Sequence, residues 1–189
     1  MVTLIIVNAQ NDFITGTRSF KGVSSILEPI KKFIKSHKSE IDKIVFACDW
    51  HPYNHCSFKK YGGDLQYHCV QFTPGACIEP KLLKFIQSLN LNYEVDLKGQ
   101  CEEFDEEGAF SEIEFVTDEL GQRYYFDSLI TVDANTDFVI CGIGEDVIFT
   151  INNLINGGII PKIYLRGTII QGDSLYQFIN SHHLEKMTL

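Results

Sequence analysis

The stretch "LIIVNAQNDF", residues 4–13, decides how the chain is expected to fold. It is a short apolar run that ends abruptly in polar side chains, the first of which is Asn8. Continuous apolarity is typical of a strand buried on both faces, and polar groups at the carboxyl end of such a strand usually serve a site. Asn8 is unexpected there, because it places an amide where a catalyst would use a carboxylate.

Further apolar runs alternate with helical patterns along the chain. The opening run is predicted to form a strand at residues 3–9, and further strands are predicted at residues 43–48, 93–97, 137–141 and 162–166. Apolar residues at helical spacing predict one helix behind a Ser24-Ser25 cap, one beginning near Pro80, and one from Val147 that is closed by Gly157-Gly158. The alternation predicts a three-layer α/β/α fold with a mostly parallel central sheet. We interpret residues 111–136 as an insertion, in which "SLITV" (128–132) is a candidate extra strand.

Bulk composition limits the classes of function. The chain has 189 residues, 44% of them hydrophobic, and a formal net charge of −9. This length predicts a single domain, 1–189, with a core that needs no metal or disulfide. The negative charge argues against nucleic acid or an anionic membrane as a partner. With no basic leader and no apolar run near about 20 residues, we expect a cytoplasmic protein whose six cysteines are free thiols.

Polar segments follow four of the predicted strands. They lie at residues 8–12, 49–55, 98–99 and 142–146. In an open α/β sheet, ligands bind outside the carboxyl ends of the strands. We therefore expect these four segments to meet at one crevice.

The second of these segments has the composition of a metal site. In "DWHPYNHCSF" (49–58), Asp49 and His51 are two residues apart and share a face if the backbone is extended. His55 lies four residues further on, and "YHCV" (67–70) supplies His68. Imidazoles with one carboxylate suit Zn, Fe or Mn. The alternative is that Asp49 caps a turn and the histidines bond within their loop.

Taken in order, these segments resemble the nicotinamidase/pyrazinamidase branch of the isochorismatase-like cysteine hydrolases. "LIIVNAQNDF" resembles the opening strand, "DWHPYNHCSF" and "HCVQFTPGA" the metal segments, "LKG" the lysine motif, and "CGIGEDV" the turn before the nucleophile helix. The matches run from residue 4 to about residue 158. The pair "DWHPxxHxSF" and "HCVxxTPGA" is specific, whereas "LKG" alone would be weak.

The resemblance implies an amidase that converts nicotinamide and water to nicotinic acid and ammonia. In that family a Cys attacks the carbonyl, an Asp moves the protons, a Lys supports the charged states, and backbone amides stabilise the oxyanion. A divalent metal binds the ring nitrogen of the substrate. Carried onto this chain, the metal ligands would be Asp49, His51 and His68, with His55 as a nearby or alternative ligand. The lysine would be Lys98, and the positions that contact the substrate would be Phe13, Leu65 and Gly144.

The chain departs from the family pattern at the reacting groups. Asn8 occupies the position of the Asp and has no titratable carboxylate. Counting without a gap from Gly142 places Ile148 at the nucleophile position, whereas aligning from Thr150 places Asp146 there. Neither is a cysteine, and Cys141 lies before the turn, where we interpret it as a small buried hydrophobe.

Two positions that often carry aromatic residues in the family also differ. Leu65 stands where a Trp is frequent, and Glu107 stands where a Tyr is common. Glu107 belongs to an acidic run at 102–107, which we interpret as a solvated face. The alternative is that one of its carboxylates pairs with Lys98 in place of the missing Asp.

The leading hypothesis is a nicotinamidase-like pseudoenzyme that retains a metal and a pocket for a nicotinamide-type small molecule but has lost the thiol reaction. The losses are expected to be coupled, because the Asp serves the thiol. A second hypothesis is an active hydrolase of a small amide or ester that uses a metal-bound water, with Asp146 or Glu145 as base. A third is an oligomeric interaction subunit, since family members often form homo-oligomers through helices that flank the sheet.

Overall fold

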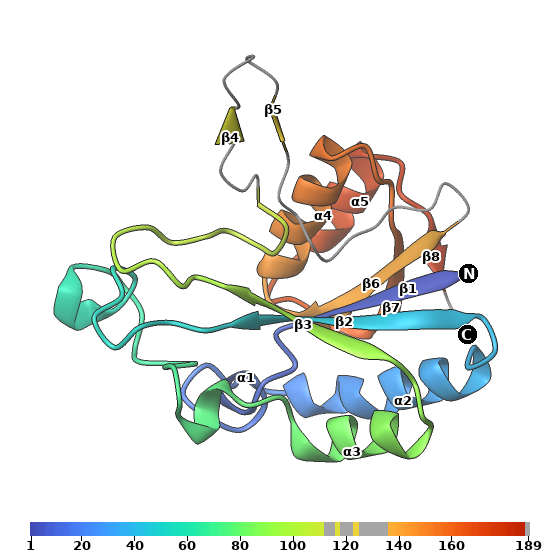
Figure 1. The fold of residues 1–189 in the computed structure, drawn as a ribbon, viewed down its shortest axis with the longest axis horizontal. Helices are drawn as coiled ribbons and strands as arrows, with labels where there is room; N and C mark the ends of the chain where they lie inside the picture. Colours follow the sequence, from blue (N-terminus) through green and yellow to red (C-terminus); the bar gives the residue numbers. More distant parts are fainter. Residues whose placement is uncertain (112–115, 118–122, 125–135, 188–189) are drawn as a thin grey trace.

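The computed structural model describes residues 1–111, 116–117, 123–124 and 136–187, and its centre is a parallel sheet (Figure 1). The six strands of this sheet are β1 (Val2–Val7), β2 (Ile41–Asp49), β3 (Tyr93–Lys98), β6 (Asp137–Ile143), β7 (Lys162–Ile169) and β8 (Lys186–Met187). They lie in the order β3-β2-β1-β6-β7-β8, and every neighbouring pair is parallel. A separate antiparallel pair consists of β4 (Val116–Thr117) and β5 (Arg123–Tyr124).

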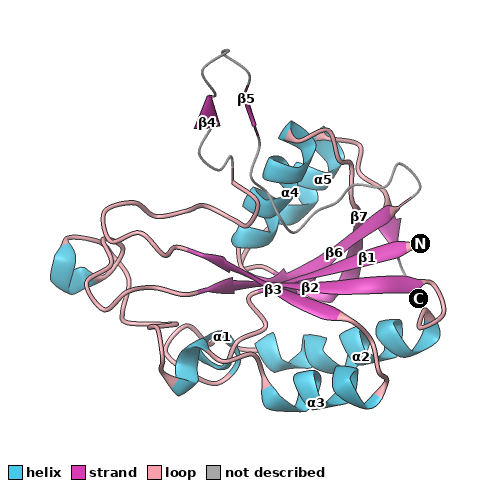
Figure 2. Cartoon of the chain, in the orientation of Figure 1, coloured by secondary structure: helices cyan, strands magenta, loops and turns pink. Residues whose placement is uncertain are grey.

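Helices cover both faces of the sheet, so the three-layer prediction is confirmed (Figures 1 and 2). One face carries α1 (Asn11–Ile14), α2 (Leu27–Ser36) and α3 (Pro80–Ser88), and the other carries α4 (Asp146–Asn156) and α5 (Ser174–Ser181). Short 3-10 helices occur at η1 (Val23–Ile26), η2 (Lys59–Tyr61) and η3 (Pro74–Ala76). Along β1, Leu4 and Ile6 enter the core under α2 and α3, while Ile5 and Val7 enter the core under α4 and α5. This alternation explains why the opening run is apolar throughout.

The five predicted strands correspond to β1, β2, β3, β6 and β7. The short edge strand β8 and the helix α5 were not predicted. The Ser24-Ser25 cap is wrong, since both serines lie inside η1 and no side chain caps α2. Candidate strand 128–132 lies outside the described residues.

The starts and ends of two helices follow the sequence signals. Pro80 begins α3, where the lost N–H costs nothing, and the carboxylate of Glu79 accepts a hydrogen bond from the N–H of Leu82 at 2.7 Å. Gly157 ends α4, and Gly158 adopts the left-handed φ of +84° that the chain uses to leave the helix.

The strand order reverses between β1 and β6. From β1 the chain builds outward through β2 to β3, and from β6 it builds in the opposite direction through β7 to β8. Such a switch point opens a crevice at the carboxyl ends of the two central strands. The predicted polar segments therefore meet where the topology requires a ligand site.

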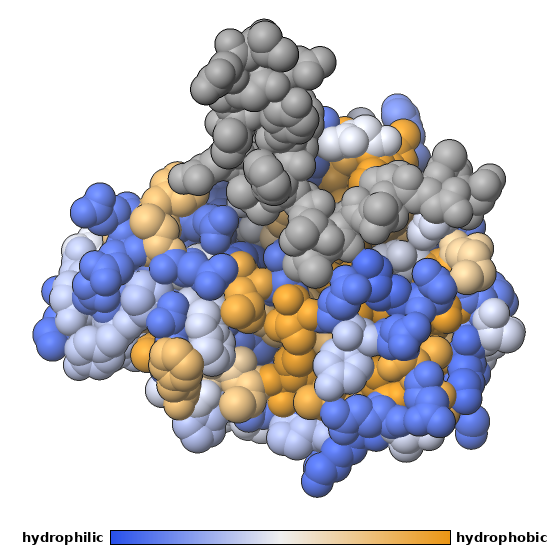
Figure 3. Space-filling view, viewed as in Figure 1, coloured by the Kyte–Doolittle hydropathy of each residue, from blue (hydrophilic) through white to orange (hydrophobic). Residues whose placement is uncertain are grey.

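The surface on the side of the edge strand β3 carries both polar and apolar side chains (Figure 3). Figure 3 shows apolar side chains gathered near the middle of this face, where Figure 1 places β3. Val95, in β3, is one of the exposed apolar side chains of the described residues. Among the described helices, none is long and apolar enough to cross a membrane.

Candidate functional site

A cavity of about 520 Å³ lies at this switch point. The residues assigned from the sequence that line it are Asn8, Phe13, Asp49, His51, Leu65, His68, Lys98, Glu107, Gly144 and Asp146. His55, Cys141 and Ile148 are not among the lining residues. The structure thus brings together most of the predicted site from six separate places in the chain.

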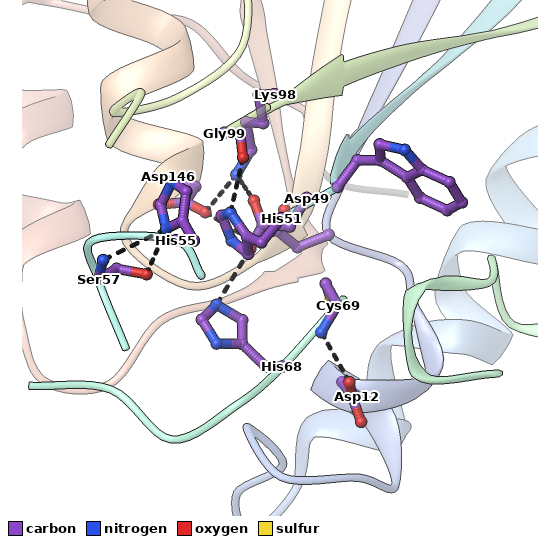
Figure 4. Close-up of polar contacts among 12 residues, drawn as sticks. Asp12, Asp49, His51, His55, Ser57, His68, Cys69, Lys98, Gly99 and Asp146 are labelled. Atoms are coloured by element: carbon purple, nitrogen blue, oxygen red, sulfur yellow. Dashed lines mark hydrogen bonds and ion pairs between the residues drawn. The ribbon is translucent and has the colours of Figure 1, made fainter. Parts of the chain in front are cut away.

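Asp49, His51 and His68 form a compact group, here called the metal corner (Figure 4). Oδ2 of Asp49 lies 3.5 Å from Nε2 of His51 and 3.5 Å from Nε2 of His68. The donors of a tetrahedral zinc site with bonds of about 2.1 Å lie roughly 3.4 Å apart. The spacing of these three atoms therefore fits a divalent ion of that size.

The two imidazoles are oriented for ligation by their other nitrogens. Nδ1 of His51 lies 2.9 Å from the carbonyl oxygen of Gly99, and Nδ1 of His68 lies 2.9 Å from that of Gln66. A carbonyl can only accept, so each Nδ1 must carry the hydrogen and donate it. This fixes the tautomer that leaves both Nε2 lone pairs facing Asp49.

His55 lies beside the metal corner but belongs to another group. Its Nδ1 is 2.7 Å from the hydroxyl of Ser57, and its Nε2 is 3.9 Å from a carboxylate oxygen of Asp105. The ring lies over that of His51 with centroids 4.2 Å apart. Burial, followed by the proximity of His51, lowers the pKa of His55 and favours the neutral ring. His68 is the imidazole that joins Asp49 and His51, whereas His55 joins His51 and Asp105.

Gln10 fixes the backbone from which Asp49 projects. Its side-chain amide donates to the carbonyl of Asp49 at 2.7 Å and to that of Ala76 at 2.8 Å, and it accepts from the N–H of Asp49 at 2.8 Å. Gln10 is completely buried, so each bond is protected from water. Sequence reasoning placed Gln10 near the crevice without giving it this role.

Asp12 supports the other side of the metal corner. Its carboxylate accepts a hydrogen bond from the N–H of Cys69 at 2.7 Å, next to His68 (Figure 4). Cys69 has a left-handed φ of +44°, which costs energy for a residue with a side chain. The bond to Asp12 helps to hold that conformation, a role that the motif "QNDF" alone does not reveal.

Gly99 is required by its contact with His51. Its φ is +67°, and a Cβ added there would lie 2.4 Å from the imidazole ring of His51. A larger residue would displace His51 from its bond to the Gly99 carbonyl. The "LKG" motif therefore links the lysine to the metal corner through its glycine.

Asn8, Lys98 and Asp146 form a second group, here called the lysine corner. Asn8 follows β1 in a left-handed conformation, φ +56°, which Asn tolerates well, and its side chain is fully buried. Nδ2 of Asn8 donates to Oδ2 of Asp146 at 2.6 Å. Nζ of Lys98 donates to the same oxygen at 2.7 Å and also to Oδ1 of Asp49 (Figure 4). Lys98 thus joins the two corners.

The ion pairs of Lys98 outweigh the cost of burying it. Burial acts to lower the pKa of Lys98, but Asp146 and Asp49 raise it well above its ordinary value. Burial likewise acts to raise the pKa of Asp49, whereas the Lys98 ammonium holds it well below 3.8. Both groups are therefore charged across the neutral range.

Asp146 and Ile148 were alternatives for one position, and the structure places them differently. Asp146 is the first residue of α4, lines the cavity and contacts Lys98 and Asn8. Ile148 packs against the hydrophobic core under α4. The N–H of Gly144, in the turn before α4, donates to the carbonyl of Ile169 at 3.0 Å and is not free to bind an oxyanion.

No cysteine lines the cavity, and all six cysteines lie in the described residues. Cys48, Cys69 and Cys141 are buried, and burial raises the pKa of each thiol far above its ordinary value. Such thiols are protonated and unreactive at neutral pH. Cys77 and Cys101 are exposed and lie outside the cavity.

The acidic run is only partly a solvated face. Glu102 and Glu103 are exposed, as interpreted from the sequence. Glu106, in contrast, lines the cavity, and its carboxylate accepts the N–H of Gly99 at 2.6 Å. In the described structure the carboxylates within 4 Å of the Lys98 ammonium are Asp49 and Asp146, neither of which belongs to the run.

Similarity to known protein sequences is limited to one short stretch of the chain. No family model matches the chain. A stretch of 62 residues is 37% identical to nicotinamidase from Saccharomyces cerevisiae, but the match covers 32% of this chain and only 29% of that protein's length.

Solved structures match over the whole chain. PnC1 from L. infantum in complex with nicotinate has a TM-score of 0.78 and 24% identity, and the match covers 100% of this chain and 92% of that chain. Yeast nicotinamidase bound to the inhibitor nicotinaldehyde has a TM-score of 0.76 and 19% identity, and the match covers 100% of both chains. The pyrazinamidase of Pyrococcus horikoshii in complex with zinc has a TM-score of 0.73 and 21% identity, and the match covers 100% of this chain and 99% of that chain. The chain has the isochorismatase-like α/β fold of these neighbours.

Proposed function

We propose that this protein binds a divalent metal ion and a small ligand of the nicotinamide type, and that it does not perform thiol-dependent amide hydrolysis. The observation that carries the proposal is the composition of the lysine corner. Lys98 and Asn8 meet the carboxylate of Asp146, and none of the six cysteines lines the cavity. A pocket with this composition has no nucleophilic sulfur to attack a carbonyl.

The metal corner supports the binding part of the proposal. Asp49, His51 and His68 would hold the ion, and one carboxylate with two neutral imidazoles suits Zn, Fe or Mn. Phe13 and Leu65 supply an apolar wall to the same cavity. Nicotinate, nicotinaldehyde and zinc occur in the solved structures that share the fold, which supports a ligand of this class here.

Asp146 gives a physical reason for Asn8. If position 8 carried a carboxylate, it would stand about as far from Asp146 as the Asn8 amide does, 2.6 Å, and two carboxylates so close cannot both ionise. The amide of Asn8 donates a hydrogen bond to Asp146 instead. The two departures from the family pattern are therefore compatible with each other, whereas either one alone would leave a repulsive or unpaired contact.

The test is to rebuild the missing groups in the metal-loaded protein. We expect no ammonia release from nicotinamide by the native chain, because loss of triad members costs several powers of ten in rate. The double variant Asn8→Asp with Asp146→Cys should release ammonia. The matched control, Asn8→Asp with Ile148→Cys, should not, since Ile148 lies outside the cavity. Rapid ammonia release by the native protein would overturn the proposal.

A hydrolase that uses an activated water is the second candidate. A bound divalent ion lowers the pKa of a water and so supplies a nucleophile. Oδ1 of Asp146 accepts no hydrogen bond from a described residue, so this chain has a carboxylate that could take a proton; Glu145 is a second candidate base. Under this alternative, the native protein would hydrolyse a small amide or 4-nitrophenyl acetate, and both a chelator and Asp146→Asn would abolish the activity.

Assembly and location stay predictions. A homo-oligomer is expected from the resemblance, and light scattering of the purified chain would test it. A cytoplasmic location is expected from the sequence, and microscopy of the tagged protein would test it.

A further inference from the structure

The cavity has an excess of negative charge among its described residues. Its carboxylates are those of Asp49, Asp105, Glu106, Glu107, Glu145 and Asp146. Its cationic side chains are Lys98 and Arg18. Six carboxylates against two cations leave four negative charges, and a divalent ion in the metal corner would remove only half of them. The charge of Lys98 is already shared by Asp49 and Asp146.

Asp146 places a carboxylate at the amino-terminal end of α4. It is the first residue of α4, an eleven-residue helix whose amino-terminal dipole favours negative charge. Its Oδ2 accepts bonds from Asn8 and Lys98, whereas its Oδ1 accepts none from a described residue. The side chain is 28% exposed and lines the cavity. One carboxylate oxygen therefore remains available to a ligand.

Asn8 supplies an independent sign of a missing donor. Its side-chain oxygen is buried and has no hydrogen-bond partner among the described residues. Exchanging the amide oxygen and nitrogen would set two oxygens against each other at the 2.6 Å contact with Asp146, so the assignment follows from the bonding. A buried acceptor without a donor is costly, and a ligand N–H would satisfy it.

We propose that the cavity selects a ligand with a cationic N–H donor, an ammonium or a related group, which binds between Asp146 Oδ1 and Asn8 Oδ1. This inference rests on the proposed function, because it names the chemical class of the ligand that the pocket takes. The cation would meet one ionised and one neutral acceptor, since Asp146 and Asn8 both line the cavity. Neutral amides could use only part of this arrangement, and carboxylates would be repelled by Asp146.

Three pyridines of similar size and different charge test the inference. The zinc-loaded native protein is titrated calorimetrically at pH 7 with 3-(aminomethyl)pyridine, which is a cation, with nicotinamide, which is neutral, and with nicotinate, which is an anion. The cation should bind about tenfold to a hundredfold more tightly than nicotinamide, the range expected for a hydrogen bond to a charged group, and nicotinate should bind most weakly.

Asp146→Asn should reduce this preference to within about threefold, because the charge is lost while the shape is kept. The matched control is Asp173→Asn, an exposed carboxylate outside the cavity, which should keep the full preference. The same preference can be tested on the native protein. Raising the salt concentration from about 50 mM to about 500 mM should reduce the difference in affinity between the cation and nicotinamide.

The outcomes separate this inference from the function on which it rests. Equal affinities for the three pyridines, or tightest binding of nicotinate, would overturn the charge selectivity and leave the proposed binding function standing. Binding of none of the three would overturn both. An unchanged preference for the cation in Asp146→Asn would show that the assigned carboxylate is not the one that selects it.

Discussion

The metal corner and the lysine corner share one cavity, yet they are built from different kinds of side chain. In the metal corner, Asp49, His51 and His68 keep the donors and spacing that a divalent ion requires. In the lysine corner, Lys98 meets the carboxylate of Asp146, which also accepts a hydrogen bond from the amide of Asn8. The difference teaches that one buried ammonium can join two groups of unlike chemistry, because it donates to a carboxylate in each of them.

Lys98 is the residue whose loss should affect both corners most. Lys98→Met would leave Asp49 and Asp146 without their ammonium, and breaking a buried pair costs about 3–5 kcal/mol. We expect the lower end, about 3 kcal/mol, because Asp146 is 28% exposed. Urea denaturation would measure the free energy of unfolding.

Lys162→Met is the matched control for Lys98→Met. Lys162 pairs with Asp137 at 3.5 Å and Glu185 at 3.8 Å, and its side chain is 32% exposed. Its loss should cost under about 1 kcal/mol. Equal costs for the two variants would contradict the structural role given to Lys98.

The metal corner is tested by removing one of its imidazoles. His68→Ala should weaken zinc binding by more than about a hundredfold, since loss of an outer partner of a ligand already costs about 10–100-fold. Competition with a chromophoric chelator would measure the affinity. His182→Ala removes an exposed histidine of the α5 terminus and should leave zinc affinity unchanged. Unchanged affinity in His68→Ala would point to His55 as the third ligand.

The coupling of the corners should also appear as a pH dependence of stability. The folded-state pKa of Asp49 is below its ordinary value of 3.8, so its contribution is present above about pH 4 and is lost as the pH falls further. The pKa of Lys98 is above its ordinary value of 10.5, so its contribution is complete below that pH and is lost only at higher pH.

Thermal unfolding of the metal-free protein should therefore show a plateau bounded by these two values. Asp49→Asn should weaken the fall in melting temperature on the acid side. If the melting temperature of this variant fell as steeply at acid pH as that of the native protein, the loss of stability would be due to other carboxylates.

The smallest expected effect concerns the reactivity of the cysteines, none of which should behave as an activated thiol. Cys77 and Cys101 are exposed and should react with a thiol reagent in the native protein, whereas Cys48, Cys69 and Cys141 should react only after unfolding. A raised pKa lowers the thiolate fraction at a given pH, so reaction of the buried three should stay slow even at mildly alkaline pH. Fast, stoichiometric labelling of Cys141 would show that a reactive sulfur had been overlooked.

The sequence predicted the layers of the fold and the proximity of Asp49, His51 and His68, because their signals are local. Buried parallel strands need continuous apolar runs, and the metal corner draws on two short segments, 49–51 and 67–70. It did not predict the roles of Gln10 and Asp12, whose bonds reach residues 39 and 57 positions away. No local pattern specifies such partners, because they lie on segments that only the folded chain brings together.

By itself, the sequence determined the alternation of the five longer sheet strands with helices, the positions of the polar strand ends, and the absence of a carboxylate at position 8. Only the tertiary structure showed that Asp146, and not Ile148, lines the cavity. A helix turns about 100° per residue, so two residues that are two positions apart point to nearly opposite sides. Packing of α4 on the sheet sets the partly buried Ile148 against the core and turns Asp146 toward Lys98 and Asn8, the latter 138 residues away in the chain.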